Sequence, residues 1–370
     1  MRALHVALLY NLKENAPHQE GAPEDALAEL DSVETVQALE AALRAGGHKV
    51  TPLEGNLDLY PTLYRMRGEI DLAFNICEGH RGESRESQVP AILEMLGIPY
   101  TASKVLANAL SLDKPMAKRI LRACGVPTPP FQIFTYGTEE LDPALSFPLF
   151  VKPSREGTGM GISSRSIVED ETSLREQVAW VIRTYRQPAL VETYLPGREL
   201  TVGLLGNALS PGTRPLSDLY DANGFHIFPI LEIDLTPVPE SQRGLYTSYV
   251  KSKMPLAPNY VCPARLEPAL ERELKRLAVA AFNALGCLDV SRVDFRLDAE
   301  GRPYVLEINT LPGLNPEISD LCIMARAEGM AYHILINEIV NLAAVRYGLD
   351  VGPSGPVGCK EEMYSEAGRA

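Results

Sequence analysis

Apolar runs of strand length alternate with helical patterns over the first hundred residues. The strand-like runs lie at residues 3–10, 48–53, 70–76 and 98–101. Residues 33–45 show a helical pattern, with Asp31 as the expected N-cap and Glu34 three residues later. This order predicts a small parallel sheet with helices on both faces. A polar insertion at residues 11–30 follows the first strand, at the end of the sheet where ligands bind in such folds.

The pattern changes after residue 112. A helical segment begins at Lys114, a second helix with one apolar face covers residues 174–185, and strands dominate from Glu199 until a helix at residues 267–285. Residues 234–262 are rich in Pro, Ser and Tyr and show no clear period, and long irregular segments in compact domains are usually functional. The sequence predicts an α/β (α+β) protein with domains at residues 1–112, 113–199 and 200–350 and a flexible tail at 351–370.

Two segments near the C-terminal end predict a β-hairpin. Charged and apolar side chains alternate in residues 290–297, and the alternation resumes at residues 304–309 after a turn at Glu300 and Gly301. The apolar faces of these segments are suited to packing against a core. The polar faces therefore point together toward the other side of the sheet.

The polar face of this hairpin carries an acidic pair. The alternation places Asp294 on the same face as Glu307, and Arg292 near Asn309. Two carboxylates roughly 5 Å apart repel each other unless a cation or a proton lies between them. A solvated polar face is one explanation. The other is a Mg²⁺ site, because this cation binds carboxylate and amide oxygens and leaves positions for water and substrate phosphates.

A second candidate site is the glycine-rich stretch "FVKPSREGTGMGIS" at residues 150–163. It follows an apolar strand and supplies Lys152 together with glycines at 157, 159 and 161. Glycines let backbone N–H groups approach an anion, and a lysine at a strand end reaches a phosphate as a point charge. The stretch is neither a P-loop nor a dinucleotide fingerprint, so a glycine-rich hairpin turn remains the alternative.

Composition narrows the choice of partners. At 370 residues, with 45% hydrophobic and 22% charged residues, the chain resembles an ordinary soluble protein of two or three domains. The net charge of −13 argues against nucleic acid and anionic membrane as partners, so a polyphosphate site has to be local. Six cysteines without CxxC spacing indicate neither zinc nor a disulfide framework. We expect a cytoplasmic protein, since there is no signal peptide pattern and no apolar segment of the roughly 20 residues that span a bilayer.

Taken together, five motifs resemble the ATP-grasp ligases, and specifically the D-alanine:D-alanine ligase family. They occur in the family's order between about residue 3 and about residue 345: "GIPYTAS…ALSLDK", "VKPSREGTGMG", "LVETYLPGRELTV", "SRVDFRLD" and "LEINTLPGLNP". The resemblance implies an ATP-grasp fold, ATP as cosubstrate, small amino-acid or peptide substrates and a homodimer. It also implies a reaction in which a carboxylate is phosphorylated by ATP and the acyl phosphate is attacked by an amine.

The resemblance assigns an ATP site to Lys114, Lys152, Ser154, Gly157, Gly159, Gly161, Glu192, Leu195 and Glu199. The two lysines would hold the α- and β-phosphates, and the glycine-rich loop would close over the triphosphate. Glu192 and Leu195 would lie at the adenine edge and Glu199 at the ribose hydroxyls.

The resemblance assigns the metal and the reaction centre to the hairpin and its surroundings. Asp294, Glu307 and Asn309 would bind two Mg²⁺ ions, which Mn²⁺ would be able to replace, with Glu307 bridging them. The residues implied for catalysis are Arg292 and the Gly313 N–H at the oxyanion, Lys251 at the γ-phosphate, and Thr158, which keeps the hydroxyl of the family's usual Ser.

The first-substrate region departs from the family's pattern. Glu78 stands where the family usually has His, and Arg85 and Glu86 add charge nearby. The family's ammonium-binding Glu has no secure counterpart in the long insertion, where Glu29 is the best candidate. The candidate substrate-binding residues are Glu29, Glu78, Arg85 and Ser319. His80 is more simply explained as a surface histidine.

Three functions fit these patterns. The first is an ATP-dependent carboxylate:amine ligase with altered amino-acid specificity, because the ATP machinery matches the family while the amino-acid pocket differs. The second is an authentic D-alanine:D-alanine ligase of peptidoglycan synthesis. The third is a non-catalytic ATP-binding regulator, against which the intact oxyanion and metal residues argue.

Overall fold

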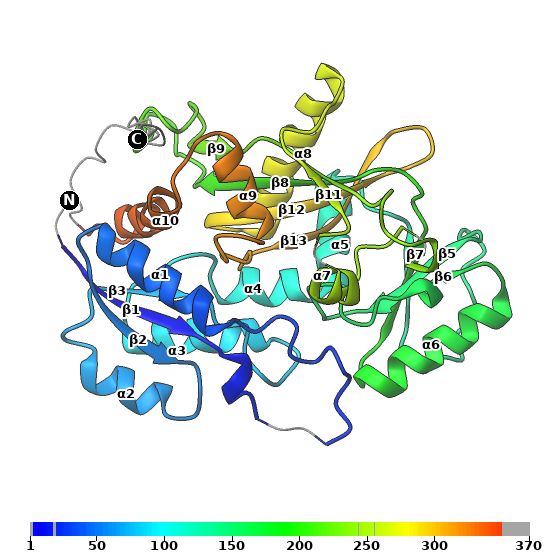
Figure 1. The fold of residues 1–370 in the computed structure, drawn as a ribbon, viewed down its shortest axis with the longest axis horizontal. Helices are drawn as coiled ribbons and strands as arrows, with labels where there is room; N and C mark the ends of the chain where they lie inside the picture. The colour runs from blue at the N-terminus through cyan, green and yellow to red at the C-terminus, as the bar shows by residue number, and fades with distance from the viewer. Residues whose placement is uncertain (1–2, 18–19, 243, 255, 350–370) are drawn as a thin grey trace, which may run out of the picture.

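A computed structural model describes residues 3–17, 20–242, 244–254 and 256–349, which form three β-sheets (Figure 1). The tail expected at 351–370 lies outside the described residues. Within the described part of the chain, no helix is long and apolar enough to cross a membrane. The four 3₁₀ helices found there are η1 (Lys13–Asn15), η2 (Arg85–Ser87), η3 (Ser164–Ser166) and η4 (Glu240–Gln242).

The first sheet is parallel, as the sequence predicts, and its strands have the order β2-β1-β3. Its strands are β1 (His5–Tyr10), β2 (Lys49–Glu54) and β3 (Leu72–Asn75). The helices of this part are α1 (Val33–Ala45), α2 (Leu59–Met66), α3 (Gln88–Leu96) and α4 (Val105–Leu112). The prediction of a fourth strand at residues 98–101 is wrong, because this segment forms only an isolated β-bridge, between Tyr100 and Ala73. Pro99 has no N–H group with which to extend that ladder.

Helix α1 begins as predicted at Val33, but its cap differs from the prediction. The Ser32 hydroxyl, and not the Asp31 carboxylate, accepts the hydrogen bond from the Thr35 N–H. Ser32 has the extended backbone that an N-cap requires, with φ −92° and ψ 162°. The Asp31 side chain is therefore not used for capping.

The second sheet is antiparallel, in the order β4-β7-β5-β6. Its strands are β4 (Phe131–Phe134), β5 (Leu149–Pro153), β6 (Ile167–Val168) and β7 (Ala189–Thr193). Helix α6 (Glu171–Tyr185) packs its predicted apolar face on this sheet, while α5 (Lys114–Ala123) leads into it. The glycine-rich loop directly follows β5.

The third sheet has the order β11-β10-β8-β12-β13, and β9 pairs with β8. Its strands are β8 (Glu199–Gly206), β9 (Phe225–Ile227), β10 (Leu231–Asp234), β11 (Asn259–Val261), β12 (Asp289–Leu297) and β13 (Pro303–Asn309). Helix α8 (Pro268–Leu285) packs against it. The predicted hairpin register is confirmed, because Asp294 pairs with Glu307 and Arg292 with Asn309.

The segment 234–262 is less irregular than the sequence predicts. It contains the short helix α7 (Ser248–Lys253) and strand β11, which pairs with β10. Thr247 caps α7, since its hydroxyl accepts from the Val250 N–H at 3.1 Å. Elements of this length are too short to produce a periodic signal.

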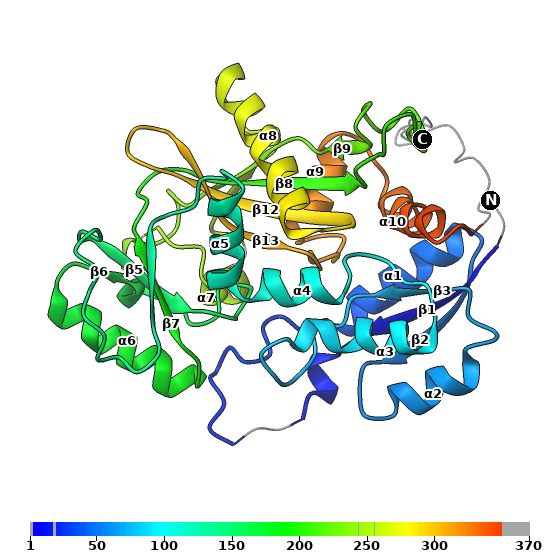
Figure 2. The ribbon, with the colours of Figure 1, turned by 180° about the vertical axis from the view of Figure 1, so that it is seen from behind.

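The first and third sheets share one hydrophobic core. A single cluster joins β1 and α1 to the C-terminal helices α9 (Asp320–Ala327) and α10 (Tyr332–Arg346). Helix α4 lies between the first sheet and the β12–β13 hairpin (Figure 2). Each sheet falls inside one expected domain, apart from Glu199 at the start of β8, and we propose the three domain boundaries on this basis.

Candidate active site

The polar face of the β12–β13 hairpin brings the candidate metal-binding side chains together. The Asp294 carboxylate accepts hydrogen bonds from the Thr201 hydroxyl at 2.6 Å and from the Asn309 side-chain amide at 3.0 Å. It also forms an ion pair with Arg292, with 2.8 Å between the nearest nitrogen and oxygen. The alternation of side chains along β12 fixes this arrangement. Val293 and Phe295, on either side of Asp294, point into the core, so Asp294 points to the opposite face.

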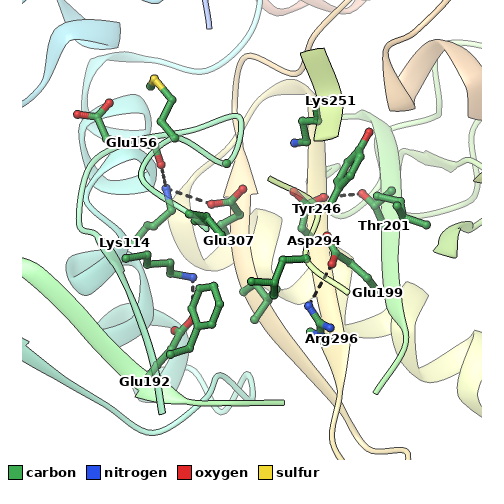
Figure 3. A pocket seen from close by; sticks show the side chains of 18 of the residues that line it. Lys114, Glu156, Glu192, Glu199, Thr201, Tyr246, Lys251, Asp294, Arg296 and Glu307 are labelled. Carbon is green, nitrogen blue, oxygen red and sulfur yellow. Dashed lines mark hydrogen bonds and ion pairs between the residues drawn. The ribbon is translucent and has the colours of Figure 1, made fainter. Parts of the chain in front are cut away.

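Glu307 faces the same site and is paired with a lysine. The Lys114 ammonium lies 3.0 Å from the Glu307 carboxylate and also donates to the Glu156 backbone carbonyl (Figure 3). Burial would raise the pKa of Glu307, but Lys114, Lys152 and Arg292 lower it to about 2. The Glu307 side chain is therefore ionised at any physiological pH.

A buried carboxylate with two lysines forms the neighbouring wall. Glu192 on β7 lies 2.6 Å from the Lys152 ammonium on β5 and 2.8 Å from the Lys118 ammonium on α5. Burial lowers the pKa of Lys118 to about 8, although Glu192 opposes this shift. The three side chains together carry one positive charge in excess, which suits a polyphosphate.

Glu192 and Lys152 line a small cavity between the second and third sheets, together with Glu307 and Asp294. The cavity has a volume of about 100 Å³, whereas sites for drug-sized ligands typically have about 300–1,000 Å³. Its covers are the glycine-rich loop, through Gly159 and Met160, and the segment that carries Tyr246 and Lys251. A nucleoside triphosphate would fit only if these covers moved.

A larger cavity of about 650 Å³ adjoins the small one. Its walls come from the insertion after β1, from the segment after β3, and from the turn at Pro312 and Gly313. The two cavities share one wall, made of Lys114, Tyr246, Lys251, Arg292, Glu307 and Asp320. A reaction between ligands in the two cavities would therefore take place beside these cations.

The insertion after β1 reaches across to the glycine-rich loop and α6 (Figure 1). The Asp25 carboxylate accepts from the Gly161 N–H at 2.9 Å, from the Tyr185 hydroxyl at 2.9 Å and from the Ser248 hydroxyl at 3.2 Å. One side chain thus joins the loop, the end of α6 and the start of α7. Since Lys251 lies on α7, Asp25 links both covers of the small cavity to the first sheet.

Glu29 and Arg85 form a second contact between the insertion and the loop. The Arg85 guanidinium donates to Glu29 at 2.6 Å, to Glu156 at 3.2 Å and to the Arg155 carbonyl at 2.8 Å. Glu29 also accepts from the Gly157 N–H. Glu29 and Arg85, two of the three charged residues predicted to bind substrate, are therefore paired with each other in this structure.

The structure separates the predicted site residues into groups. The small cavity is lined by Lys114, Lys152, Gly159, Glu192, Glu199, Lys251, Arg292, Asp294 and Glu307. The large cavity is lined by Glu29, Glu78, Gly157, Thr158, Asn309, Gly313 and Ser319. The remaining predicted residues, which are Ser154, Gly161, Leu195 and Arg85, line neither cavity. The Ser154 hydroxyl instead donates to the Pro188 carbonyl at 2.9 Å.

Several residues at the site were missed from the sequence. Lys118 lies four residues after Lys114, on the same helix face as buried Leu121, and a lysine in an apolar stripe is the signal that could have identified it. Asp320 lies 3.4 Å from Arg292, and Asp25 was hidden within a polar insertion. These two assignments depend on tertiary contacts with no local sequence signal.

The hairpin residues fit a hard divalent cation. They offer an ionised Glu307, the Asp294 carboxylate and the Asn309 amide oxygen on one face, and oxygen donors of this kind suit Mg²⁺. Among the described residues, no group of three or more His, Cys, Asp or Glu is placed to hold a metal. A Mg²⁺ ion here would thus need Asn309, water or phosphate oxygens in addition to the two carboxylates.

The fold and the sequence resemble those of known proteins. The structure resembles a D-alanine–D-alanine ligase from Bacillus anthracis solved in complex with ATP, with a TM-score of 0.69 and 24% identity over 94% of this chain and 99% of that one. Residues 120–229 and 232–341 match the family model described as the D-ala D-ala ligase C-terminus. The architecture and these matches define an ATP-grasp ligase.

Curated relatives give the family. A D-alanine–D-alanine ligase from Pelotomaculum thermopropionicum is 31% identical over 86% of this chain and 93% of its own length. One from Syntrophotalea carbinolica is 34% identical over 85% of this chain and 92% of its own length. An uncharacterized protein of Sinorhizobium fredii, y4sG, is 39% identical over 83% of this chain and 86% of its own length. The chain belongs to the D-alanine–D-alanine ligase family, as the motifs predict, and is an enzyme of the ATP-dependent, ADP-forming ligase class.

Proposed function

We propose that this enzyme uses ATP to join the carboxylate of one small amino-acid or peptide substrate to the amine of another. The observation that carries the proposal is the shared wall of the two cavities. It presents the cations Lys114, Lys251 and Arg292 between a small cavity rich in lysines and a large cavity open to other ligands. This is the arrangement needed where a phosphoryl group passes from a nucleotide to an acceptor.

In the first step, an oxygen of the substrate carboxylate attacks the γ-phosphorus of ATP. The bond from phosphorus to the bridging oxygen breaks, and ADP leaves with that electron pair. Lys114 and Lys152 would neutralise the phosphates and Lys251 the transferred group, while Glu192 holds Lys152 at 2.6 Å. Such a transfer depends chiefly on positioning and charge neutralisation.

In the second step, the amine nitrogen attacks the carbonyl carbon of the acyl phosphate. The carbonyl oxygen gains negative charge, phosphate leaves, and the nitrogen loses a proton. Arg292 and the Gly313 N–H are the groups on the cavity wall proposed to stabilise this oxyanion. Pro312 restricts the turn that presents Gly313.

We propose that Asp294, Glu307 and Asn309 would hold a pair of Mg²⁺ ions, or Mn²⁺ in their place. The ions would supply charge stabilisation to the phosphoryl group. Asp294 is now held by Arg292 and Glu307 by Lys114, so these cations occupy the face that metal and phosphate would share. The oxygen donors of the three side chains support this assignment.

The amino-acid specificity is proposed to differ from that of a D-alanine:D-alanine ligase. Glu78 replaces the family's usual His, and Glu78 and Glu86 both line the large cavity. The second candidate function is nevertheless authentic D-alanine:D-alanine ligation, because relatives that are 31–34% identical carry that name. A cytoplasmic homodimer is a further proposal that rests on the family resemblance alone.

The test is release of ADP and phosphate from ATP, measured with D- and L-amino acids singly and in pairs, with mass spectrometry of the products. An amide product and ADP in equal amounts are expected. With substrate labelled by ¹⁸O in its carboxylate, one label should appear in the released phosphate, since the acyl phosphate breaks at the carbonyl carbon. ATP binding without turnover for any pair would instead favour the non-catalytic regulator.

A further inference from the structure

Three carboxylates in the wall of the large cavity have no ion partner. Asp31, Glu78 and Glu86 all line this cavity and are half-buried. Within the described part of the chain, none of these three carboxylates takes part in a hydrogen bond or a salt bridge. Asp31 is free because Ser32 caps α1 in its place. An unpaired carboxylate in such a place is costly unless a ligand compensates it.

The nearby cations are used elsewhere. Arg85 is paired with Glu29 and Glu156, and Lys114 is paired with Glu307. Lys13 is exposed. Burial and mutual repulsion raise the pKa of Glu78 well above its usual value, that of Glu86 to about 8, and burial raises that of Asp31 to about 7. The cavity wall therefore carries acidic groups that form no ion pair within the described part of the chain.

The three carboxylates exceed the need of an ordinary amino acid. A single carboxylate matches one α-ammonium group, which leaves two without a partner. A metal ion is a poor explanation, because the described residues contain no group of three or more His, Cys, Asp or Glu placed to hold one. A neutral side chain would leave the carboxylates unpaired, and an acidic side chain would be repelled. A second ammonium or guanidinium group satisfies them.

We infer that the first substrate is an amino acid or small peptide with a second cationic group, which binds between Glu78 and Glu86. This inference rests on the proposed ligase function and names the substrate class of that site. The substrate carboxylate would face Arg292 on the shared wall and Gly313 in the wall of the large cavity, while its cationic group would point toward the first sheet. Asp31 is a third acidic group in the same wall. Glu78, Glu86 and Asp31 together are therefore the proposed specificity determinants.

Lysine and norleucine provide a matched pair of probes, because they have side chains of similar length and only lysine carries the second ammonium group. Each enantiomer is tested with one constant amine substrate, and kcat/KM is measured as ADP release with mass spectrometry of the amide. Binding of each probe is also measured by calorimetry in the presence of a non-hydrolysable ATP analogue and Mg²⁺. We expect lysine to exceed norleucine by about tenfold or more in both measurements.

Two variants show whether the preference depends on the named residues. In Glu78→Gln and Glu86→Gln the preference for lysine over norleucine should fall by about tenfold. Both changes keep the shape of the side chain and remove only its ability to ionise, so a thermal midpoint close to that of the wild type should confirm that the variants are folded. The matched control is Glu317→Gln, which removes an exposed charge from another wall of the same cavity and should leave the preference unchanged.

Equal or better use of norleucine by the wild type would overturn the inference while leaving the ligase proposal intact, provided that an amide and ADP still form. An unchanged lysine preference in both Gln variants would also overturn it, since other groups would then recognise the cation. If no substrate releases ADP, the proposed function itself fails and the inference fails with it. That last case would be recognised by lysine that binds in the calorimeter while no ADP is released.

Discussion

The two cavities differ in how their charges are balanced. On the nucleotide side every acidic group named above has a cationic neighbour, as with Glu307 and Lys114 or Glu192 and its two lysines. On the substrate side Glu78 and Glu86 form no ion pair within the described residues, because the nearby Arg85 and Lys114 are paired with other carboxylates. A triphosphate brings the same negative charge to every enzyme that binds it, so the residues around it can be shared across a family. The substrate side must match a ligand that varies.

The largest expected effect tests the nucleotide side. Glu307→Gln keeps the shape of the side chain but removes a charge proposed to hold the Mg²⁺ ions, so turnover should fall by about 10² or more. Wild-type activity should also disappear in EDTA and return with Mg²⁺. The control is Glu300→Gln, at the exposed turn of the same hairpin. Full activity in Glu307→Gln or in EDTA would remove the metal assignment.

Lys152→Ala is expected to have the next largest effect, and it separates nucleotide binding from substrate binding. Loss of this point charge should weaken ATP binding by about tenfold or more, because a charged hydrogen bond typically contributes about 1.5–3 kcal/mol. The Kd for ATP is measured by calorimetry, with Lys275→Ala, at a half-buried position on α8, as control. An unchanged Kd and an unchanged kcat would show that Lys152 does not contact the nucleotide.

A smaller effect is expected at the covers that join the two sides. Asp25→Asn weakens three hydrogen bonds to the loop, α6 and α7, so the covers should close less completely and admit water to the acyl phosphate. We expect about threefold more ATP hydrolysed per amide formed, with Glu24→Gln in the same segment as control. Hydrogen exchange in residues 150–163 and 234–262 should slow when ATP analogue and Mg²⁺ bind. The role is disproved if Asp25→Asn and the wild type hydrolyse the same amount of ATP per amide formed and if nucleotide binding leaves the hydrogen exchange of both segments unchanged.

The smallest expected effect is a pH dependence confined to the substrate side. Glu86 faces Glu29, Arg85, Lys114 and Glu307, and its pKa is raised to about 8, so it is mostly protonated at pH 7. A cationic substrate favours the ionised form, so binding releases a proton and KM for lysine should fall as pH rises from 6.5 to 8.5. The fall should be several-fold and absent for norleucine. A KM for lysine that rises over this range would contradict the assignment.

The sequence predicted one side of the site better than the other, for physical reasons. The hairpin register followed from a period of two and a short turn, so the approach of Asp294 to Glu307 was visible in advance. Glu78 and Glu86 were noticed only as departures from a pattern. Asp31 was mistaken for a helix cap and Asp25 was not noticed, because their contacts come from segments far apart in the chain. Tertiary contacts of this kind leave no local period.

The central claim is that the nucleotide side is that of a D-alanine–D-alanine ligase while the substrate side serves a different first substrate. The most direct test is kcat/KM for D-alanine against other D- and L-amino acids and small peptides, in the wild type and in Glu78→His. We predict that D-alanine is not the best substrate of the wild type and that Glu78→His improves its relative use. If the wild type forms D-alanyl-D-alanine with a kcat/KM above that of every other substrate, the claim is contradicted and the enzyme is an ordinary D-alanine–D-alanine ligase.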